Sequence, residues 1–118
     1  MSDYELSKYY LLSKEIDILE NEIALELGRA EEYISNNEIL SVLESYVNKL
    51  KTKKHEAYTA KLKIEEFMDS VDDPEIRVIL RLRYVKMMTW EQIGEEIYMS
   101  SSGAFRKCKR FFAAQRAV

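Results

Sequence analysis

The chain has 118 residues and a mass of 13.9 kDa, and 47% of its residues are hydrophobic and 33% charged. This size and composition fit one small folded domain with an extended helical arm, and they argue against a disordered chain. Its one cysteine, Cys108, excludes an intrachain disulfide, and together with the one histidine, His55, it cannot supply the four ligands of a structural zinc site. No run of about 18 apolar residues occurs, and the start of the chain lacks a cationic segment followed by an apolar core. We therefore expect a cytoplasmic protein without a membrane span or a secretion signal.

The net charge of −3 hides opposite charges in two parts of the chain. Residues 1–73 hold 9 Lys and Arg against 17 Asp and Glu, which gives −8, whereas residues 74–118 hold 9 against 4, which gives +5. A cationic surface attracts polyanions. We therefore expect the C-terminal part to face nucleic acid.

The first predicted helix starts at a capping pair, because Ser2 and Glu5 have the spacing of a reciprocal cap. Apolar residues then recur at alternating spacings of three and four, which indicates one buried stripe. These residues are Tyr9, Leu12, Ile16, Leu19 and Ile23. Gly28 weakens a helix by about 1 kcal/mol relative to alanine. The pattern leaves open whether this helix ends at Gly28 or continues to Tyr33.

A second long helix follows the turn-forming segment Ser-Asn-Asn-Glu at residues 35–38, which also offers a helix cap. Apolar residues recur every seven positions along it, and a companion set lies three positions after them. The first set is Leu43, Leu50, Ala57, Ile64 and Val71, and the companions are Tyr46, Ala60 and Phe67. Two such helices joined by a short turn predict an acidic antiparallel hairpin arm over residues 1–72.

Further apolar residues lie off the main stripes of both helices, namely Ile18, Leu25, Val42, Val47 and Leu62. An exposed apolar surface of this kind suits contact with another subunit or with the C-terminal module. We therefore expect a homodimer formed through the N-terminal helices. The alternative is that these residues complete the core of one monomeric bundle.

A second module of three helices is predicted over residues 73–118. Asp73 is a suitable N-cap, and Pro74 suits the first helical position. The residues predicted to be buried on this helix are Ile76, Ile79, Leu80 and Tyr84, with Arg77, Arg81 and Arg83 on its remaining surface. Thr89 and Gln92 form another capping pair and open a short helix that contains Gly94. Because glycine has no side chain, Gly94 permits close approach of the neighbouring helix.

The final helix is predicted to begin near Ser100 and to carry a cationic face. Its inward residues are Ala104, Phe105, Cys108, Phe111 and Phe112, and its remaining sides carry Arg106, Lys107, Lys109 and Arg110. Basic side chains and a helix N-terminus suit DNA phosphates, and such a helix docks in the major groove. Near its start, Ser101 and Ser102 are placed to reach base edges, and Arg106 can pair with guanine. The alternative is that these charges form only a solvated face.

Residues 74–112 resemble region four of bacterial sigma factors and the related C-terminal modules of phage transcription regulators. Residues 79–84 are similar to the first helix of that family, and residues 89–97 are similar to its second. An acidic helical part followed by this module is also similar to small phage regulators of the ArpU type, which control late gene expression. The resemblance implies DNA contacts by Ser101, Ser102, Arg106 and Lys109, with Thr89 near the DNA backbone. Tyr98 departs from the pattern, because the family usually has a left-handed glycine at that position.

We expect an all-α, non-enzymatic regulator of transcription, encoded by a phage or prophage, that binds double-stranded DNA without a cofactor. The sequence holds no constellation of nucleophile, base or metal ligands. Two alternatives remain: a sigma-like adaptor that binds RNA polymerase, and the small, DNA-recognition subunit of a phage packaging terminase. The DNA target, the sign of regulation and the oligomeric state stay open.

Overall fold

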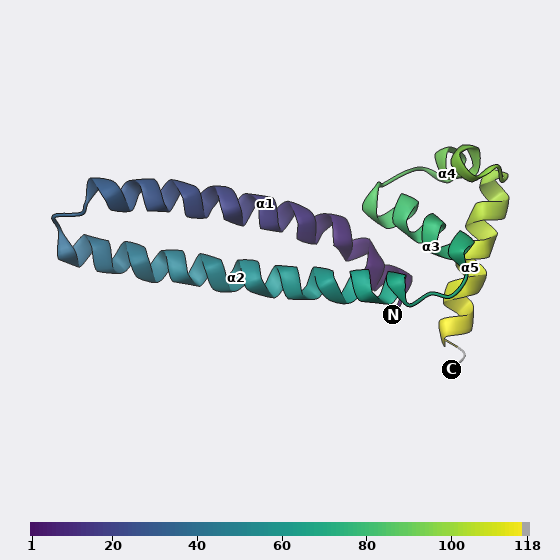
Figure 1. Ribbon diagram of the computed structural model, residues 1–118, viewed down its shortest axis with the longest axis horizontal. Coiled ribbons are helices and arrows are strands. Elements are labelled where there is room, and N and C mark those ends of the chain that lie inside the picture. The colour runs from purple at the N-terminus through teal and green to yellow at the C-terminus, as the bar shows by residue number, and fades with distance from the viewer. Residues whose placement is uncertain (117–118) are drawn as a thin grey trace. The chain divides into compact units, whose positions relative to one another are not determined.

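The computed structural model describes residues 1–116, and every regular element in this range is a helix. The elements are α1 (Asp3–Glu32), α2 (Asn37–Asp69), α3 (Pro74–Leu80), the π-helical turn η1 (Arg81–Val85), α4 (Trp90–Ile97) and α5 (Ser101–Arg116), as Figure 1 shows. The predicted all-α fold is confirmed. None of the helices in the described range combines the length and the apolar character that a membrane span needs.

Side chains cap the helix starts where the sequence predicts them. At α1, Ser2 Oγ accepts a hydrogen bond from the Glu5 amide at 3.1 Å, and the Ser2 amide donates to Glu5 Oε1 at 3.2 Å. Thr89 and Gln92 form the same reciprocal box at α4. Asp73 caps α3 through its carboxylate. These bonds fix the helix boundaries, because they satisfy amides that have no partner within the helix.

Helix α1 passes through Gly28 without a break and ends at Glu32. This answers the question that the sequence left open. The turn that follows is closed by Asn36, whose Oδ1 accepts a hydrogen bond from the Ile39 amide at 3.2 Å and so caps α2. The local weakness at Gly28 is therefore tolerated within a long helix.

Replacing Gly28 by alanine should raise the free energy of unfolding by about 0.5–1 kcal/mol, because alanine loses less backbone entropy on folding into a helix. A methyl group at this position meets no atom within 4 Å, so the substitution introduces no clash. Urea unfolding followed by circular dichroism measures the change. A lower stability of Gly28→Ala would contradict a helical conformation at this residue.

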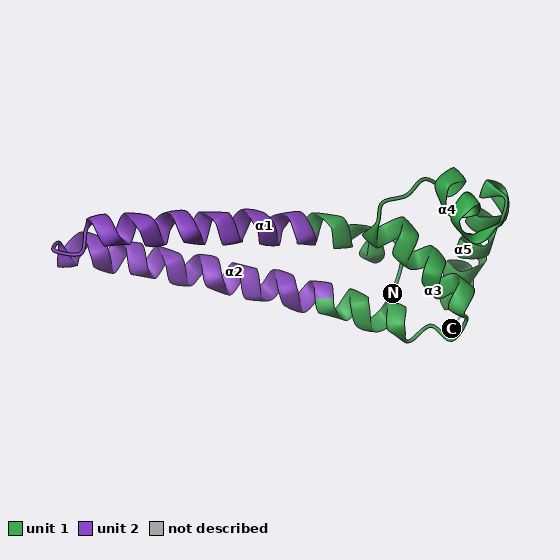
Figure 2. Cartoon of the chain, turned by 45° about the horizontal axis from the view of Figure 1, so that its top comes forward, with its two compact units in different colours: residues 1–11, 62–118 green, residues 12–61 purple. Residues whose placement is uncertain are grey.

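The chain forms two compact units (Figure 2). Unit 2 spans residues 12–61 and is an antiparallel hairpin. Its core cluster consists of Leu19, Ile23, Val47 and Leu50. Tyr58 Oη donates to Glu20 Oε1 at 3.0 Å and adds a polar link between the two helices. Unit 1 contains residues 1–11 and the described residues from Leu62 onward.

The predicted companion stripe of α2 is wrong at Tyr46, whereas its other two members, Ala60 and Phe67, are half-buried. Tyr46 is 44% exposed, whereas its neighbour Val47 is only 5% exposed. Met68 is buried in the same way, four residues after Ile64. Companions at three and at four positions both satisfy a heptad pattern. Of the positions four residues on, the helix buries Val47 and Met68, and the spacing alone does not distinguish these from the positions three residues on.

In unit 1, the first residues of α1 and the last residues of α2 pack with the C-terminal helices. Leu6 is fully buried there. The Tyr84 hydroxyl donates to the carboxylate of Asp3, and Tyr9 Oη donates to Glu65 Oε1 at 2.5 Å. Burial, helped by the Glu65 carboxylate, raises the pKa of Tyr9 to about 12. The predicted division into an arm over residues 1–72 and a DNA-binding module over residues 73–118 stays a prediction. Unit 1 contains packed segments from both sides of this boundary.

Two arginines that the sequence places on the surface of the first module helix instead make defined contacts within unit 1. Arg81 Nη2 pairs with Glu65 Oε2 at 2.5 Å and with Asp69 Oδ1 at 3.2 Å. Arg77 Nη1 donates to the carbonyl oxygen of Val71 at 2.6 Å. Arg81 therefore links η1 to the end of α2 and is paired with its carboxylates, while Arg77 links α3 to the connection that follows α2.

Candidate nucleic-acid interface

Helices α4 and α5 are joined by a tight turn of three residues. A methyl group added to Gly94 would lie 2.4 Å from the Met99 carbonyl oxygen and 3.1 Å from the Ser101 amide nitrogen, so only glycine fits. Tyr98 caps α4 in a left-handed conformation, with φ 58° and ψ 43°. The turn requires this left-handed conformation at residue 98, although the conformation is energetically unfavourable for a tyrosine. The predicted close approach at Gly94 is confirmed.

The start of α5 presents a helix N-terminus. Ser100 Oγ accepts a hydrogen bond from the Gly103 amide at 3.0 Å. The predicted cap is therefore present, and the Ser100 hydroxyl oxygen already accepts a hydrogen bond within the protein. Ser101 and Ser102 follow in the first turn, and both are exposed. The partial positive charge of a helix start therefore lies beside two small polar side chains, an arrangement that suits an anion.

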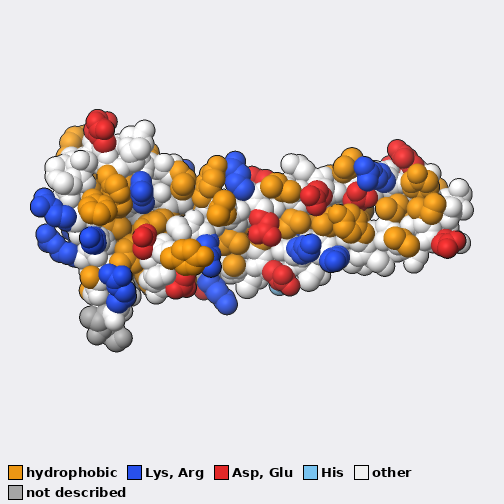
Figure 3. Space-filling view, turned by 180° about the vertical axis from the view of Figure 1, so that it is seen from behind, with side chains coloured by type: hydrophobic (Ala, Val, Ile, Leu, Met, Phe, Trp, Pro, Cys, Tyr) orange, Lys and Arg blue, Asp and Glu red, His pale blue; other side chains and the backbone are white. Residues whose placement is uncertain are grey.

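The sides of α5 differ in exposure and charge. Ala104, Cys108 and Phe112 are buried, which confirms the apolar side of the helix. Burial raises the pKa of the Cys108 thiol to about 11, so the thiol stays protonated at neutral pH. The exposed side carries Ser102, Arg106, Lys109 and Arg110. Figure 3 shows Lys and Arg side chains gathered at the module end of one face of the molecule.

Lys107 lies on a different side of α5. Its Nζ is 2.6 Å from Glu75 Oε1 and 3.4 Å from Asp73 Oδ2, both at the start of α3. The hydrogen bond to Glu75 and the neighbouring Asp73 raise the pKa of Lys107. The pKa of Asp73 is lowered, chiefly by the hydrogen bond from the Glu75 amide. Lys107 therefore connects two helices of unit 1, and its position separates it from Arg106 and Arg110.

Phe105 was predicted to face inward, but it is 43% exposed. Its ring meets Trp90 edge-on, with centroids 5.4 Å apart. The prediction was wrong because Phe105 lies at the edge of the buried side of α5, next to the exposed Arg106 and Lys109. Thr89 lies at the start of α4, and its hydroxyl accepts the hydrogen bond from the Gln92 amide that forms the cap.

Two further cations in or near α5 were not predicted as residues of the site. Arg116 is exposed and lies seven residues after Lys109, so the heptad spacing within the helix could have identified it. Arg83 lies over the Trp90 ring, with its guanidinium carbon 4.7 Å from the ring centroid, and Nη1 donates to the Met88 carbonyl at 2.9 Å. Only the fold brings Arg83 and Trp90 together, so no sequence signal could have found this pair.

Among residues 1–116, no group of three or more His, Cys, Asp or Glu side chains is arranged to hold a metal ion. The candidate site instead consists of a helix N-terminus with exposed serine and cationic side chains. Such a surface can attract phosphate through charge and can donate hydrogen bonds to it.

The comparison with known families gives one result. A family model described as a protein of unknown function, DUF1492, matches residues 36–115. The chain belongs to the DUF1492 family. The matched range runs from the cap of α2 through nearly all of α5, so it includes α2, α3, η1 and α4 of this DUF1492 chain and residues 101–115 of α5. No curated protein and no solved structure matches the chain.

Proposed function

We propose that this DUF1492 protein is a DNA-binding regulator of transcription that inserts α5 into the major groove. The observation that carries the proposal is the exposed side of α5, where Arg106, Lys109 and Arg110 follow the serines of the first turn. Major-groove readers place the start of a recognition helix against base edges and use cationic side chains on the phosphates. The tight connection at Gly94 supports this reading, because it holds α4 and α5 in a fixed relation.

The resemblance of residues 74–112 to region four of sigma factors supports the same proposal. The left-handed Tyr98 occupies the place of the glycine in that pattern and takes the same backbone conformation. We extend the proposal to late-gene control in a phage or prophage, because small regulators of the ArpU type share this layout. The protein acts in the bacterial cytoplasm on double-stranded DNA.

Charge on α4 restricts which surfaces of the module meet phosphate. Glu91, Glu95 and Glu96 are all exposed on this helix. Carboxylates repel phosphate, so the exposed side of α4 is unsuited to lie against the DNA backbone. Phosphate contacts in this proposal therefore come from α5 and from the start of α4 at Thr89.

Replacing Arg106 by alanine should weaken binding to duplex DNA from the region upstream of the protein's own gene by about 1–3 kcal/mol, the cost of losing a base-contacting arginine. Arg110→Ala should weaken binding to that duplex and to a random duplex equally. It should also lower the slope of log K against log salt by about 1, because it removes one phosphate contact. Fluorescence anisotropy over a salt series measures both effects.

The matched control for these variants is Lys49→Ala, which removes one exposed positive charge from the hairpin. It should leave both the affinity and the salt slope nearly unchanged. Equal effects of Arg106→Ala and Lys49→Ala would reject α5 as the recognition helix, because the binding would then reflect overall charge.

The hairpin is proposed to join two copies of the chain, so that two modules bind two half-sites. Exposed apolar side chains on unit 2 support this role, among them Ile18, Leu25 and Val42. Sedimentation of the full chain should give the mass of a dimer. An assembly of eight or more subunits would instead favour the small subunit of a packaging terminase.

A further inference from the structure

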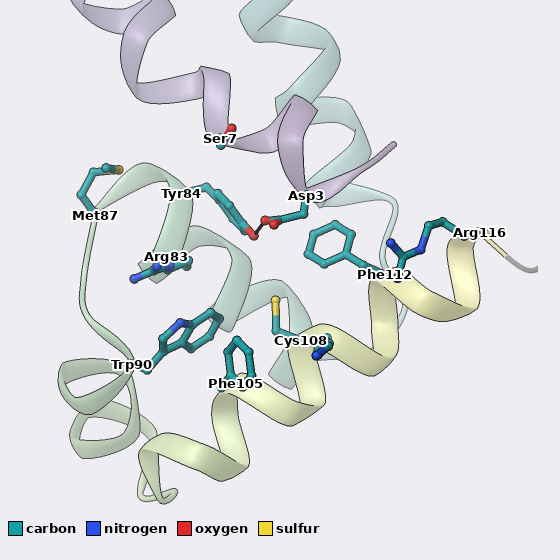
Figure 4. Close-up of a pocket in the computed structure, with 11 residues that line it drawn as sticks. Asp3, Ser7, Arg83, Tyr84, Met87, Trp90, Phe105, Cys108, Phe112 and Arg116 are labelled. Atoms are coloured by element: carbon teal, nitrogen blue, oxygen red, sulfur yellow. Dashed lines mark hydrogen bonds between the residues drawn. The ribbon is translucent and has the colours of Figure 1, made fainter.

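A cavity of about 500 Å³ opens in unit 1 beside α5 (Figure 4). Its lining combines an apolar wall with a few charged side chains. The wall includes Tyr84, Trp90, Phe105, Cys108 and Phe112, and the charged lining residues are Asp3, Arg83, Lys109 and Arg116. Small-molecule sites have this size and this composition, with apolar walls and few polar groups that fix the orientation of the ligand.

The aromatic rings of the wall are arranged in edge-to-face pairs. Trp90 and Phe105 have centroids 5.4 Å apart, and Tyr84 and Phe112 have centroids 6.2 Å apart with planes at 90°. In Figure 4 these side chains come from three different elements and point into the same space. A flat or branched apolar group can therefore contact several rings at once.

Cations lie directly beside this apolar wall. Lys109 Nζ is 5.7 Å from the Phe105 ring centroid, and the Arg83 guanidinium lies over Trp90. Arg116 supplies a third positive charge to the lining. The one carboxylate of the lining, Asp3, accepts the hydrogen bond of the Tyr84 hydroxyl. The charge of the lining is therefore positive, and an anionic occupant complements it.

The rim of the cavity contains a strained residue. Met87 has φ 57°, in the left-handed region, and its side chain is 55% exposed. Strained backbone is found preferentially at ligand clamps, and a methionine side chain adapts to the shape of what it contacts. Met87 is therefore suited to close over an apolar ligand.

We propose that this cavity binds a small amphipathic anion, with an aromatic or branched apolar body against the Trp90 and Phe105 rings and one acidic group paired with Lys109. The cavity shares Lys109 with the proposed DNA-binding side of α5, whereas Ser101, Ser102 and Arg106 do not line it. Its test needs no DNA, so the proposed function and this site can fail independently.

The probe is 8-anilinonaphthalene-1-sulfonate, which carries one sulfonate on an apolar aromatic body. The chain has a single tryptophan, Trp90, so its emission reports directly on the cavity. Titration of the full chain should give saturable binding of one probe per chain, with quenching of Trp90. N-phenyl-1-naphthylamine, which has a similar ring system without the sulfonate, should bind more weakly.

Lys109→Gln should weaken binding of the sulfonate probe by about two- to fivefold, the factor expected for a partly exposed ion pair, and leave binding of the neutral probe unchanged. Arg110→Gln is the matched control, because it removes a neighbouring exposed cation that does not line the cavity. The control should bind both probes like the original chain. Thermal unfolding of each variant checks that the fold is kept.

Three results would overturn the proposal. They are an absence of saturable binding, an equal loss of sulfonate binding in Lys109→Gln and Arg110→Gln, and a dimer that the probe dissociates. The last result would identify a second copy of the chain as the occupant. Analytical ultracentrifugation with and without the probe distinguishes this case.

Discussion

Replacing Leu6 by alanine should lower the free energy of unfolding by about 2–5 kcal/mol, the usual cost of a cavity in a packed core. Leu6 is 0% exposed and belongs to unit 1, which also contains the C-terminal helices. The loss is a large part of the stability of a small domain, which is about 5–15 kcal/mol in total. Because Trp90 lies in α4, urea unfolding followed by its fluorescence emission reports on the stability of the C-terminal helices.

Leu11→Ala is the matched control, since it makes the same chemical change on the same helix. Leu11 is 67% exposed, so its replacement should change stability by less than about 0.5 kcal/mol. If Leu6→Ala leaves the unfolding of the C-terminal helices unchanged, residues 1–11 do not contribute to their core.

Replacing Gly94 by alanine should destabilise the protein by about 1–3 kcal/mol, because the added methyl group would overlap the Met99 carbonyl. The turn from Tyr98 to Ser100 has little room to yield, since the Met99 amide also donates to the Gly94 carbonyl at 2.8 Å. Thermal and urea unfolding both report the loss. Duplex binding should weaken as well if the relation of α4 to α5 positions the proposed recognition helix.

Gly28→Ala provides the contrast for Gly94→Ala. The two variants make the same substitution within a helix, but only Gly94 faces neighbouring backbone at close range. Opposite signs of the two stability changes would show that contact at Gly94, rather than helix propensity, decides the effect. A stabilised Gly94→Ala variant would contradict the close approach of α4 and the turn.

Local features of the fold could be predicted from the sequence because they depend on neighbours along the chain. The caps at Ser2, Asp73 and Thr89 each need a polar side chain within three residues of the amide that it accepts. The apolar stripe of α1 and the glycine at position 94 are likewise local signals. The exposed cations of α5 follow from helical periodicity once its buried side is known.

Features that depend on distant parts of the chain could not be predicted. The ion pairs of Lys107 require the start of α3 to lie beside α5, and nothing in the local sequence specifies this. The hydrogen bond between Tyr84 and Asp3 joins residues 81 positions apart. The cavity beside Trp90 is built from several segments in the same way. A count of Lys and Arg residues therefore overestimates the number of cationic side chains that are available to a ligand, since some of them pair within the fold.

The hairpin leaves unit 1 after Leu11 and returns to it at Leu62, so it is inserted between two segments that pack with the C-terminal helices. A heptad pattern returns nearly the same helix face after seven residues. Removing or adding seven residues in each leg would therefore preserve which side chains are buried in the hairpin. Arm length can thus vary in discrete steps during evolution while the C-terminal helices keep their core, and family members with longer or shorter arms should differ by such steps.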